Sequence, residues 1–258
     1  MTMESAGIPP AHPVAPAAPA KNVFQRMAGV FFAPEETFAD IARRPDILWP
    51  LLILTLFGFL TTALVMPRMD MDAMVAETGA TLKKQQPNMS DADVERVARM
   101  SKAMGKVSGW IGPLLIIIGY VVIALVLWGA FRLMGGDGDY KQALSTTLYA
   151  YVPRMILGGL IGVVILLLRE PVNPLDIQSV VKTSPAFLAD RTEQPVLFSL
   201  LGSFDIFVLW SIYLLTVGFS KLARVSKLKA AAIIISLWLV TVVVKVGFAA
   251  LGAARMKG

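Results

Sequence analysis

Two long apolar runs joined by a short polar link lie in the middle of this 258-residue chain. The first extends from Trp110 to Phe131 without a charged residue, and the second, from Tyr149 to Leu168, carries only Arg154. A helix rises about 1.5 Å per residue, so about 20 apolar residues suffice to cross a bilayer core. The link, Gly135 to Lys141, is too short to be a domain. This stretch is therefore predicted to be a helical hairpin inside a membrane.

The composition agrees with a membrane domain and excludes several kinds of chemistry. Hydrophobic residues make up 56% of the chain, above the roughly 45–50% that is typical of soluble domains. The absence of cysteine rules out disulfides, thiol catalysis and Cys-ligated metals. The single histidine, His12, lies in a proline-rich tail, where it cannot act as a general base in a shaped pocket. The net charge of +6 is spread over helix ends and loops, which indicates membrane topology and lipid contact and not nucleic-acid binding.

Hydropathy predicts an all-α integral membrane protein with one membrane domain over residues 46–254. Its five transmembrane helices are expected at about 47–66, 110–131, 149–168, 196–219 and 230–252. The long polar connection after the first span carries two stripes of apolar residues at helical spacing, and Ser90 has the features of an N-cap. We therefore predict an extramembrane helical hairpin over residues 70–107.

The residues before the first span divide into a tail and an amphipathic segment. Residues 1–20 are rich in proline and alanine and are predicted to be disordered. Residues 21–45 are predicted to form two amphipathic helices, the second starting at Pro34, where the missing N–H has no cost. Such helices lie in the headgroup interface. Phe24, Phe31 and Phe38 would then face lipid or, alternatively, a docking partner.

The basic residues of the short loops predict the orientation of the chain. With the N-terminus inside, ten Lys and Arg side chains of the N-terminal segment and the short loops fall on the cytoplasmic side, including Arg132, Lys141 and four in the last loop. The short segments on the opposite side carry fewer. Since cytoplasmic loops are enriched in basic residues, we expect a cytoplasmic N-terminus and an outside C-terminus.

Three ionisable residues fall inside predicted spans: Arg154, Asp205 and Lys245. Each costs about 2.5–3.5 kcal/mol on insertion scales, so such residues are functional candidates. Asp205 and Lys245 lie at about 13 Å and 11 Å from the outer ends of adjacent antiparallel spans, and can therefore meet. The pair could fix helix register or serve as a proton or ion relay, or the two residues could be unpaired. Arg154 lies near the inner end of its predicted span, from which its side chain can reach the interface.

Two further motifs are typical of interaction or metal sites. Gly158 and Gly162 form a G-x-x-x-G motif, which lets helix backbones approach closely and allows a homo-oligomer. A run of methionines could offer thioethers to Cu(I), namely Met66, Met69, Met71 and Met74. Helical spacing already explains Met71 and Met74 as packing residues, so no metal or cofactor is predicted.

The sequence contains no catalytic motif at a position where the corresponding chemistry could take place. Gly136 to Asp139 matches the G-x-G-D of intramembrane aspartyl proteases, but this segment lies in a connecting loop after Arg132. That chemistry needs two carboxylates close together within the membrane. Zinc-protease, serine-hydrolase and P-loop motifs are missing from the sequence. The chain is therefore predicted not to be an enzyme.

Several segments, in their order and spacing, carry a family pattern. They are Ala33–Phe38 with Pro34, then Gly135, Gly136, Tyr149 and Pro153, then Ser203–Phe207 with Asp205 and Trp210, and finally Lys227–Ala230. Together they resemble the Yip family, multispanning membrane proteins named for eukaryotic members that interact with Ypt/Rab GTPases. The resemblance implies five spans and no catalytic residues. Eukaryotic members have a cytoplasmic N-terminal region and act as membrane-embedded binding partners in vesicle traffic, a role that does not carry over to a prokaryotic chain without Rab partners. The long first loop looks like prokaryotic relatives, which implies the cell (inner) membrane of a prokaryote.

Two functions follow from these observations. The first is a non-enzymatic scaffold in the lipid bilayer that binds an unknown membrane or cytoplasmic protein or organises the membrane. The second is a small transporter or an ion or proton pathway that uses Asp205 and Lys245. Neutralising Asp205 would impair transport, whereas a scaffold would lose function when Phe24, Phe31 or Phe38 is made polar.

Overall fold

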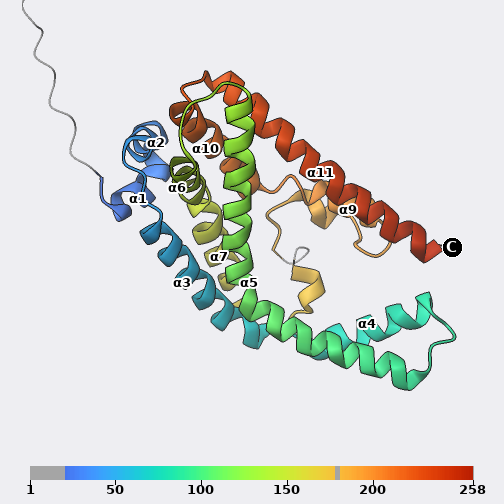
Figure 1. Cartoon of the computed structure of the whole chain (residues 1–258). Helices are drawn as coiled ribbons and strands as arrows, with labels where there is room; N and C mark the ends of the chain where they lie inside the picture. The colour runs from blue at the N-terminus through green and yellow to red at the C-terminus, as the bar shows by residue number, and fades with distance from the viewer. Residues whose placement is uncertain (1–20, 178–180, 258) are drawn as a thin grey trace, which may run out of the picture.

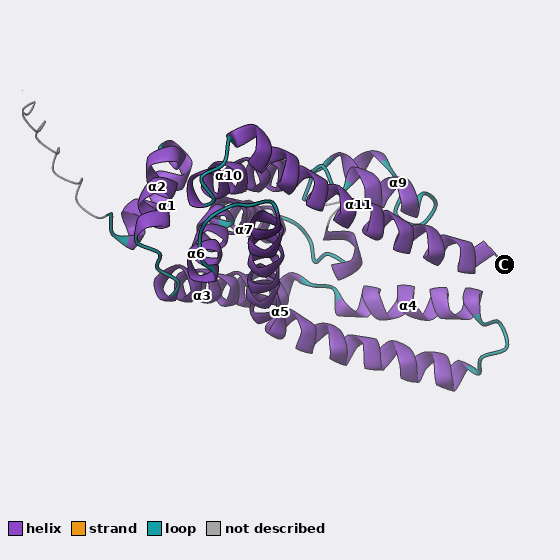
Figure 2. Ribbon diagram, turned by 45° about the horizontal axis from the view of Figure 1, so that its top comes forward, coloured by secondary structure: helices purple, strands orange, loops and turns teal. Residues whose placement is uncertain are grey.

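Helices and their connecting loops make up the part of the chain that the structure describes. A computed structural model describes residues 21–177 and 181–257, in which there are no β-strands (Figures 1 and 2). The predicted disordered tail, residues 1–20, lies outside the described residues. The protein is thus an all-helical integral membrane protein, as its hydropathy predicts.

Four helical segments within the described residues are long and apolar enough to cross a membrane. They are α3 (Leu48–Val65) with its continuation to Arg68, α5 (Asp91–Leu133), α6 (Tyr140–Ala150) together with α7 (Val152–Leu167), and α11 (Lys227–Lys257). A fifth candidate consists of α9 (Pro195–Leu201) and α10 (Ile206–Leu222), which are bent by 44° at a short break. The five predicted spans therefore correspond to four candidates and one bent pair.

The predicted extramembrane hairpin is formed by α4 (Met71–Gln85) and the first part of α5. Ser90 caps α5 as expected, by accepting a hydrogen bond from the backbone N–H of Asp93. The hairpin helix does not end before the membrane, because α5 continues through Pro113 into the span. A proline inside a helix removes one backbone hydrogen bond and bends it. Figure 1 shows α5 bent, with its first part beside α4 and its second part in the bundle.

The third span begins earlier than predicted, at Tyr140 and not at Tyr149. All residues from Ala143 to Ala150 are buried, although several carry hydroxyl groups. The Thr147 hydroxyl donates to the carbonyl of Ala143 at 2.8 Å, so a polar side chain is satisfied within its own helix. This extension places Arg154 close to the middle of the span. By residue count this is deeper than the sequence indicated, and the interpretation in which the Arg154 side chain reaches the interface stays a prediction.

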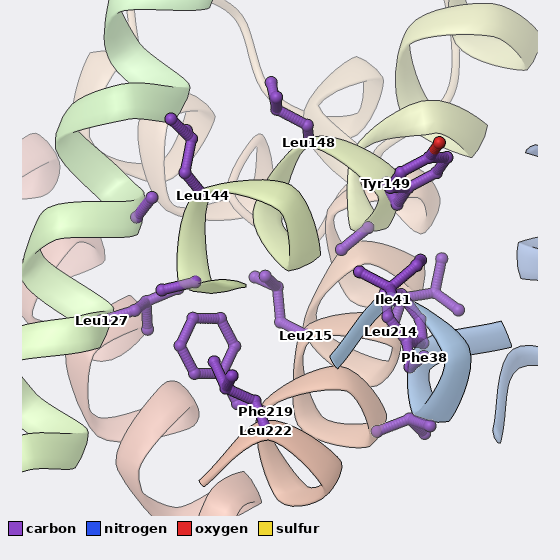
Figure 3. Close-up of a cluster of buried hydrophobic side chains, with 14 of the residues drawn as sticks. Phe38, Ile41, Leu127, Leu144, Leu148, Tyr149, Leu214, Leu215, Phe219 and Leu222 are labelled. Atoms are coloured by element: carbon purple, nitrogen blue, oxygen red, sulfur yellow. The ribbon is translucent and has the colours of Figure 1, made fainter. Parts of the chain in front are cut away.

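The N-terminal helices α1 (Val23–Phe32) and α2 (Pro34–Arg43) pack into the bundle. Figure 3 shows Phe38 and Ile41 of α2 beside Leu214 of α10, and both side chains of α2 are fully buried. α2 approaches α10 closely because Gly218 has no side chain: a Cβ there would lie 3.0 Å from Cδ1 of Phe38. The prediction that Phe38 faces lipid or a partner is therefore wrong, since its ring belongs to the protein core.

Candidate functional site

A buried network of charges fixes α1 and α2 to each other, and we call it the N-terminal anchor (Arg26, Asp40, Asp46, Ser145 and Tyr149). The Arg26 side chain is only 3% exposed. Its Nε donates to Oδ2 of Asp40 at 2.9 Å, and its Nη1 donates to Oδ2 of Asp46 at 3.0 Å. The guanidinium is planar and always charged, so it can hold two carboxylates in a fixed geometry. The anchor thus joins α1, α2 and the linker to α3.

Two residues of α6 attach this network to the membrane bundle. The Tyr149 hydroxyl donates to Oδ2 of Asp46 at 2.8 Å. The Ser145 hydroxyl accepts from the backbone N–H of Asp46 at 3.2 Å and donates to its carbonyl oxygen at 2.7 Å. Tyr149 is one of the residues of the family pattern, and the structure gives it a concrete role as a hydrogen-bond donor. The sequence analysis missed Arg26, Asp40 and Asp46, because charges in an amphipathic segment are usually solvated.

A second set of ion pairs holds the start of α2. Glu35 contacts Lys227, at the start of α11, and Lys221, near the end of α10. The Lys227 ammonium, followed by that of Lys221, holds the pKa of Glu35 below its ordinary value of 4.5. A lowered carboxyl pKa contributes stability above pH 4.5, and this contribution disappears as the pH falls through the lowered pKa.

We expect the Glu35→Gln variant to melt at a lower temperature than the wild type at pH 7. The difference should shrink as the pH falls through the lowered pKa of Glu35, because the protonated side chain no longer attracts the two lysines. Thermal unfolding in detergent at several pH values measures this difference. Glu170→Gln is the matched control, since Glu170 is exposed and has no ion pair among the described residues. A difference that is independent of pH would contradict the assigned ion pairs.

A cavity of about 490 Å³ lies within the bundle, and we call it the intramembrane cavity. Residues of α3, α7, α10 and α11 line it, together with the segment that precedes α9. Three of the lining residues are ionisable: Arg154, Asp205 and Lys245. These are the same three residues that the sequence analysis selected inside spans. The structure therefore brings all three to one cavity.

Asp205 lies at the break between α9 and α10 and caps α10. Its Oδ1 accepts hydrogen bonds from the backbone N–H groups of Phe207 at 2.9 Å and Val208 at 3.2 Å. The Thr183 hydroxyl donates to Oδ2, and the Ile206 N–H donates to the carbonyl of Thr183 at 3.1 Å. Within the predicted fourth span, residues 196–219, Asp205 therefore marks a break between two helices and does not lie inside a continuous one. Aspartate favours an N-cap over a helix interior because its side chain satisfies otherwise free backbone N–H groups.

Lys245 does not form the predicted pair with Asp205. No ion pair joins the two within the described residues, and Nζ of Lys245 instead lies beside Gly202, 3.5 Å from where a Cβ of that residue would be. Arg154 likewise has no carboxylate partner in residues 21–177 and 181–257. Two cations therefore face the cavity without an acidic partner from the described chain.

This geometry makes a prediction about coupling. Asp205→Asn keeps an oxygen that can cap α10, and Lys245→Met removes a cation that has no paired acid, so each should have a small effect on stability. Their effects should add to within about 0.5 kcal/mol, as expected for groups that do not interact. Thermal unfolding of the wild type, both single variants and the double variant measures the coupling. If the double variant is more stable than the sum of the two single losses predicts, by more than about 0.5 kcal/mol, Asp205 and Lys245 form a direct pair.

The remaining residues of the family pattern have structural roles. Gly135 adopts a positive φ of 78° directly after α5, a conformation that glycine adopts without strain. A Cβ on Gly136 would lie 2.9 Å from that of Ala223, so this glycine lets two loops approach.

Pro34 and Pro153, which also belong to the family pattern, lie in the first turns of α2 and α7. Trp210 packs edge-on against Phe31, with ring centroids 5.7 Å apart, so Phe31 also contacts the bundle.

The G-x-x-x-G stretch of α7 takes part in contacts within the chain. A Cβ on Gly158 would lie 3.5 Å from the ring of Phe207, and both Gly158 and Gly162 line the intramembrane cavity. Gly162 has open space where a Cβ would be. A homo-oligomer through these two glycines stays a prediction.

The comparison with known protein families agrees with this arrangement. The Yip1 domain matches residues 28–248. The chain belongs to the Yip1 domain family. This match includes α2, the intramembrane cavity and every member of the N-terminal anchor except Arg26.

A curated bacterial relative of this Yip1 domain protein is described as a membrane protein. It is "Membrane protein YknW" of Bacillus subtilis (strain 168), which is 27% identical over 200 residues. The aligned region covers 77% of this chain and 79% of that protein. No solved structure matches the chain.

Proposed function

We propose that this Yip1-domain protein is a non-enzymatic scaffold in the membrane that binds a protein partner through the outer face of α1. The observation that carries this proposal is the contrast within α1: Arg26 is fixed in the N-terminal anchor, while Phe24 is 70% exposed and Phe32 is 87% exposed. The anchor fixes the position of α1, and with it the backbone of Phe24 and Phe32, before any partner arrives. A preorganised surface loses less conformational entropy on binding than a flexible one.

The surroundings of Phe24 favour a protein partner over lipid alone. Its neighbours Asn22 and Gln25 are exposed and form a capping box at the start of α1. An aromatic side chain within a polar rim is the usual arrangement of a protein interface. Within this proposal the surface lies on the cytoplasmic side of a prokaryotic cell (inner) membrane, with the C-terminus on the opposite side.

The experiment compares crosslinked partners of the wild type with those of Phe24→Ser/Phe32→Ser. Both side chains are exposed, so the variant should fold normally while it loses most of the captured partner. Crosslinking in cells, purification in mild detergent and quantitative mass spectrometry measure the loss. Point variants are preferable to deleting residues 1–45, because that deletion removes Arg26, Phe38 and Ile41 from the core.

Phe248→Ser is the matched control, because Phe248 is 71% exposed on α11, away from α1. A partner that is lost from the double variant and kept by the control supports the proposal. Equal capture by all three proteins would overturn it. Loss of lipid contact by α1 in reconstituted vesicles, without any change in captured proteins, would show that the two rings bind the membrane instead.

The intramembrane cavity favours transport as a second candidate function. Transporters commonly bind substrates where a transmembrane helix is interrupted near the middle of the bilayer, and the α9–α10 break lines this cavity. Asp205→Asn removes the charge and keeps a capping oxygen. Flux is measured in proteoliposomes that contain the wild type or this variant. If the substitution abolishes the flux and leaves the melting temperature unchanged, the result supports a pathway through Asp205 and Lys245.

A further inference from the structure

A second cavity, of about 580 Å³, adjoins the intramembrane cavity, and we call it the apolar groove. Its lining comes mainly from aliphatic and aromatic residues of α5, α10 and α11. Figure 1 shows α5 and α11 diverging from the end of the bundle where α11 begins. The two cavities share Arg154, Gly202, Val208 and Lys245. A polar and an apolar compartment therefore meet at two cationic residues.

The charges at this junction favour an anionic ligand. Arg154 and Lys245 have no acidic partner in the described residues. The carboxylate of Asp205 already accepts two backbone N–H groups and the Thr183 hydroxyl, so its charge is committed to the α9–α10 break. Charged side chains inside a membrane pair with opposite charges or with water in a cavity. An anionic group between the two cations would supply the missing partner.

The shape of the paired cavities selects among anions. A small free anion would occupy only the polar side and would make no contact with the apolar groove, whose lining is largely Leu, Ile and Val side chains. An amphiphile satisfies both compartments at once. The most abundant anionic amphiphile available inside a bilayer is a phospholipid.

We propose that a membrane phospholipid binds at this junction, with its phosphate between Arg154 and Lys245 and an acyl chain in the apolar groove. Arg154 lies close to the middle of the span Tyr140–Leu167. The phosphate therefore lies deeper in the membrane than the headgroup layer does. This site is independent of the partner surface on α1.

Native mass spectrometry of the protein released from detergent tests the charged half of the site. The wild type should retain one phospholipid, and Arg154→Gln/Lys245→Gln should reduce the retained fraction at least tenfold. Arg169→Gln is the matched control, because Arg169 is an exposed cation just after α7 and lies outside both cavities. Lipid retained equally by the wild type and the double variant would overturn the proposal.

The apolar half is tested by Thr241→Phe, which fills the groove and leaves both cations in place. This variant should lose the bound phospholipid. After delipidation, however, the variant and the wild type should bind inorganic phosphate with the same affinity. Retention of lipid by Thr241→Phe would overturn the proposal. Displacement of the wild-type lipid by millimolar inorganic phosphate would show a free-anion site and overturn it as well.

A third measurement keeps Arg154 and Lys245 unchanged, so that its result does not depend on whether the charge variants fold. One equivalent of a phospholipid with brominated acyl chains should quench the fluorescence of Trp238, which lines the apolar groove. Trp238→Phe should remove most of the quenching. If the quenching persists in that variant, the brominated chain lies elsewhere and the proposal fails.

Discussion

Replacing Arg26 with alanine is expected to lower the free energy of unfolding by about 3–5 kcal/mol, the usual effect of breaking a buried ion pair from one side. The substitution leaves Asp40 and Asp46 facing each other without their cation inside the protein. Because the anchor joins both N-terminal helices to α6, the loss should release α1 and α2 together. Thermal unfolding in detergent and the yield of monodisperse protein measure the effect.

Two further substitutions make this result specific. Arg43→Ala, in the same segment, should change stability by at most about 0.5 kcal/mol. Arg43 is exposed, and among the residues that the structure describes its side chain bonds only to the carbonyl of Ala39. Arg26→Lys should give an intermediate loss, since lysine keeps the charge and loses the planar geometry that reaches both carboxylates. Equal stability of the Arg26→Ala and Arg43→Ala proteins would show that the anchor does not hold the N-terminal helices.

Replacing Gly218 with valine is expected to destabilise the protein by about 1–3 kcal/mol, the usual range for overpacking a core. A Cβ at this position would lie 2.5 Å from Cγ2 of Thr146 and 3.0 Å from Cδ1 of Phe38. Neither neighbour can move freely, because both are fully buried. The valine should therefore push α2 away from α10, which faster hydrogen exchange of the α2 amides would report.

The matched control for this substitution is Gly129→Val. Gly129 also lies in a membrane-spanning helix, but open space surrounds the position of its Cβ. Its replacement should change stability by at most about 0.5 kcal/mol. If both variants unfold at the same temperature, glycine at position 218 is not required for the contact with α2.

Hydropathy and capping signals predicted much of this fold. Runs of apolar residues located the four candidate spans and the bent pair of α9 and α10, and Ser90 and Pro34 marked helix starts that the structure confirms. The start of the third span was the main error, because the apolar run begins only at Tyr149. The preceding polar residues are buried in α6 all the same, where the Thr147 hydroxyl donates to the carbonyl of Ala143. A window of sequence cannot tell where such a polar side chain finds its partner.

For the candidate sites, too, the sequence indicated which residues matter but not which distant residues they contact. Arg154, Asp205 and Lys245 were selected because charge inside a span is costly, and all three line one cavity. Their predicted pairing failed because Asp205 is engaged by residues of α10 and by Thr183. The N-terminal anchor depends on a contact between Asp46 and Tyr149, which are far apart in the chain. No local pattern in one sequence reveals such a contact.

The unequal lengths of α3 and α11 make the protein sensitive to the thickness of its membrane. α3 has 18 residues and α11 has 31, which correspond to about 27 Å and 46 Å, against a hydrocarbon layer of about 30 Å. The longer helix must tilt to match that layer. A thicker membrane would bring α11 upright and draw it toward α5. Growth-dependent changes in lipid length would thus act on the width of the opening between these two helices.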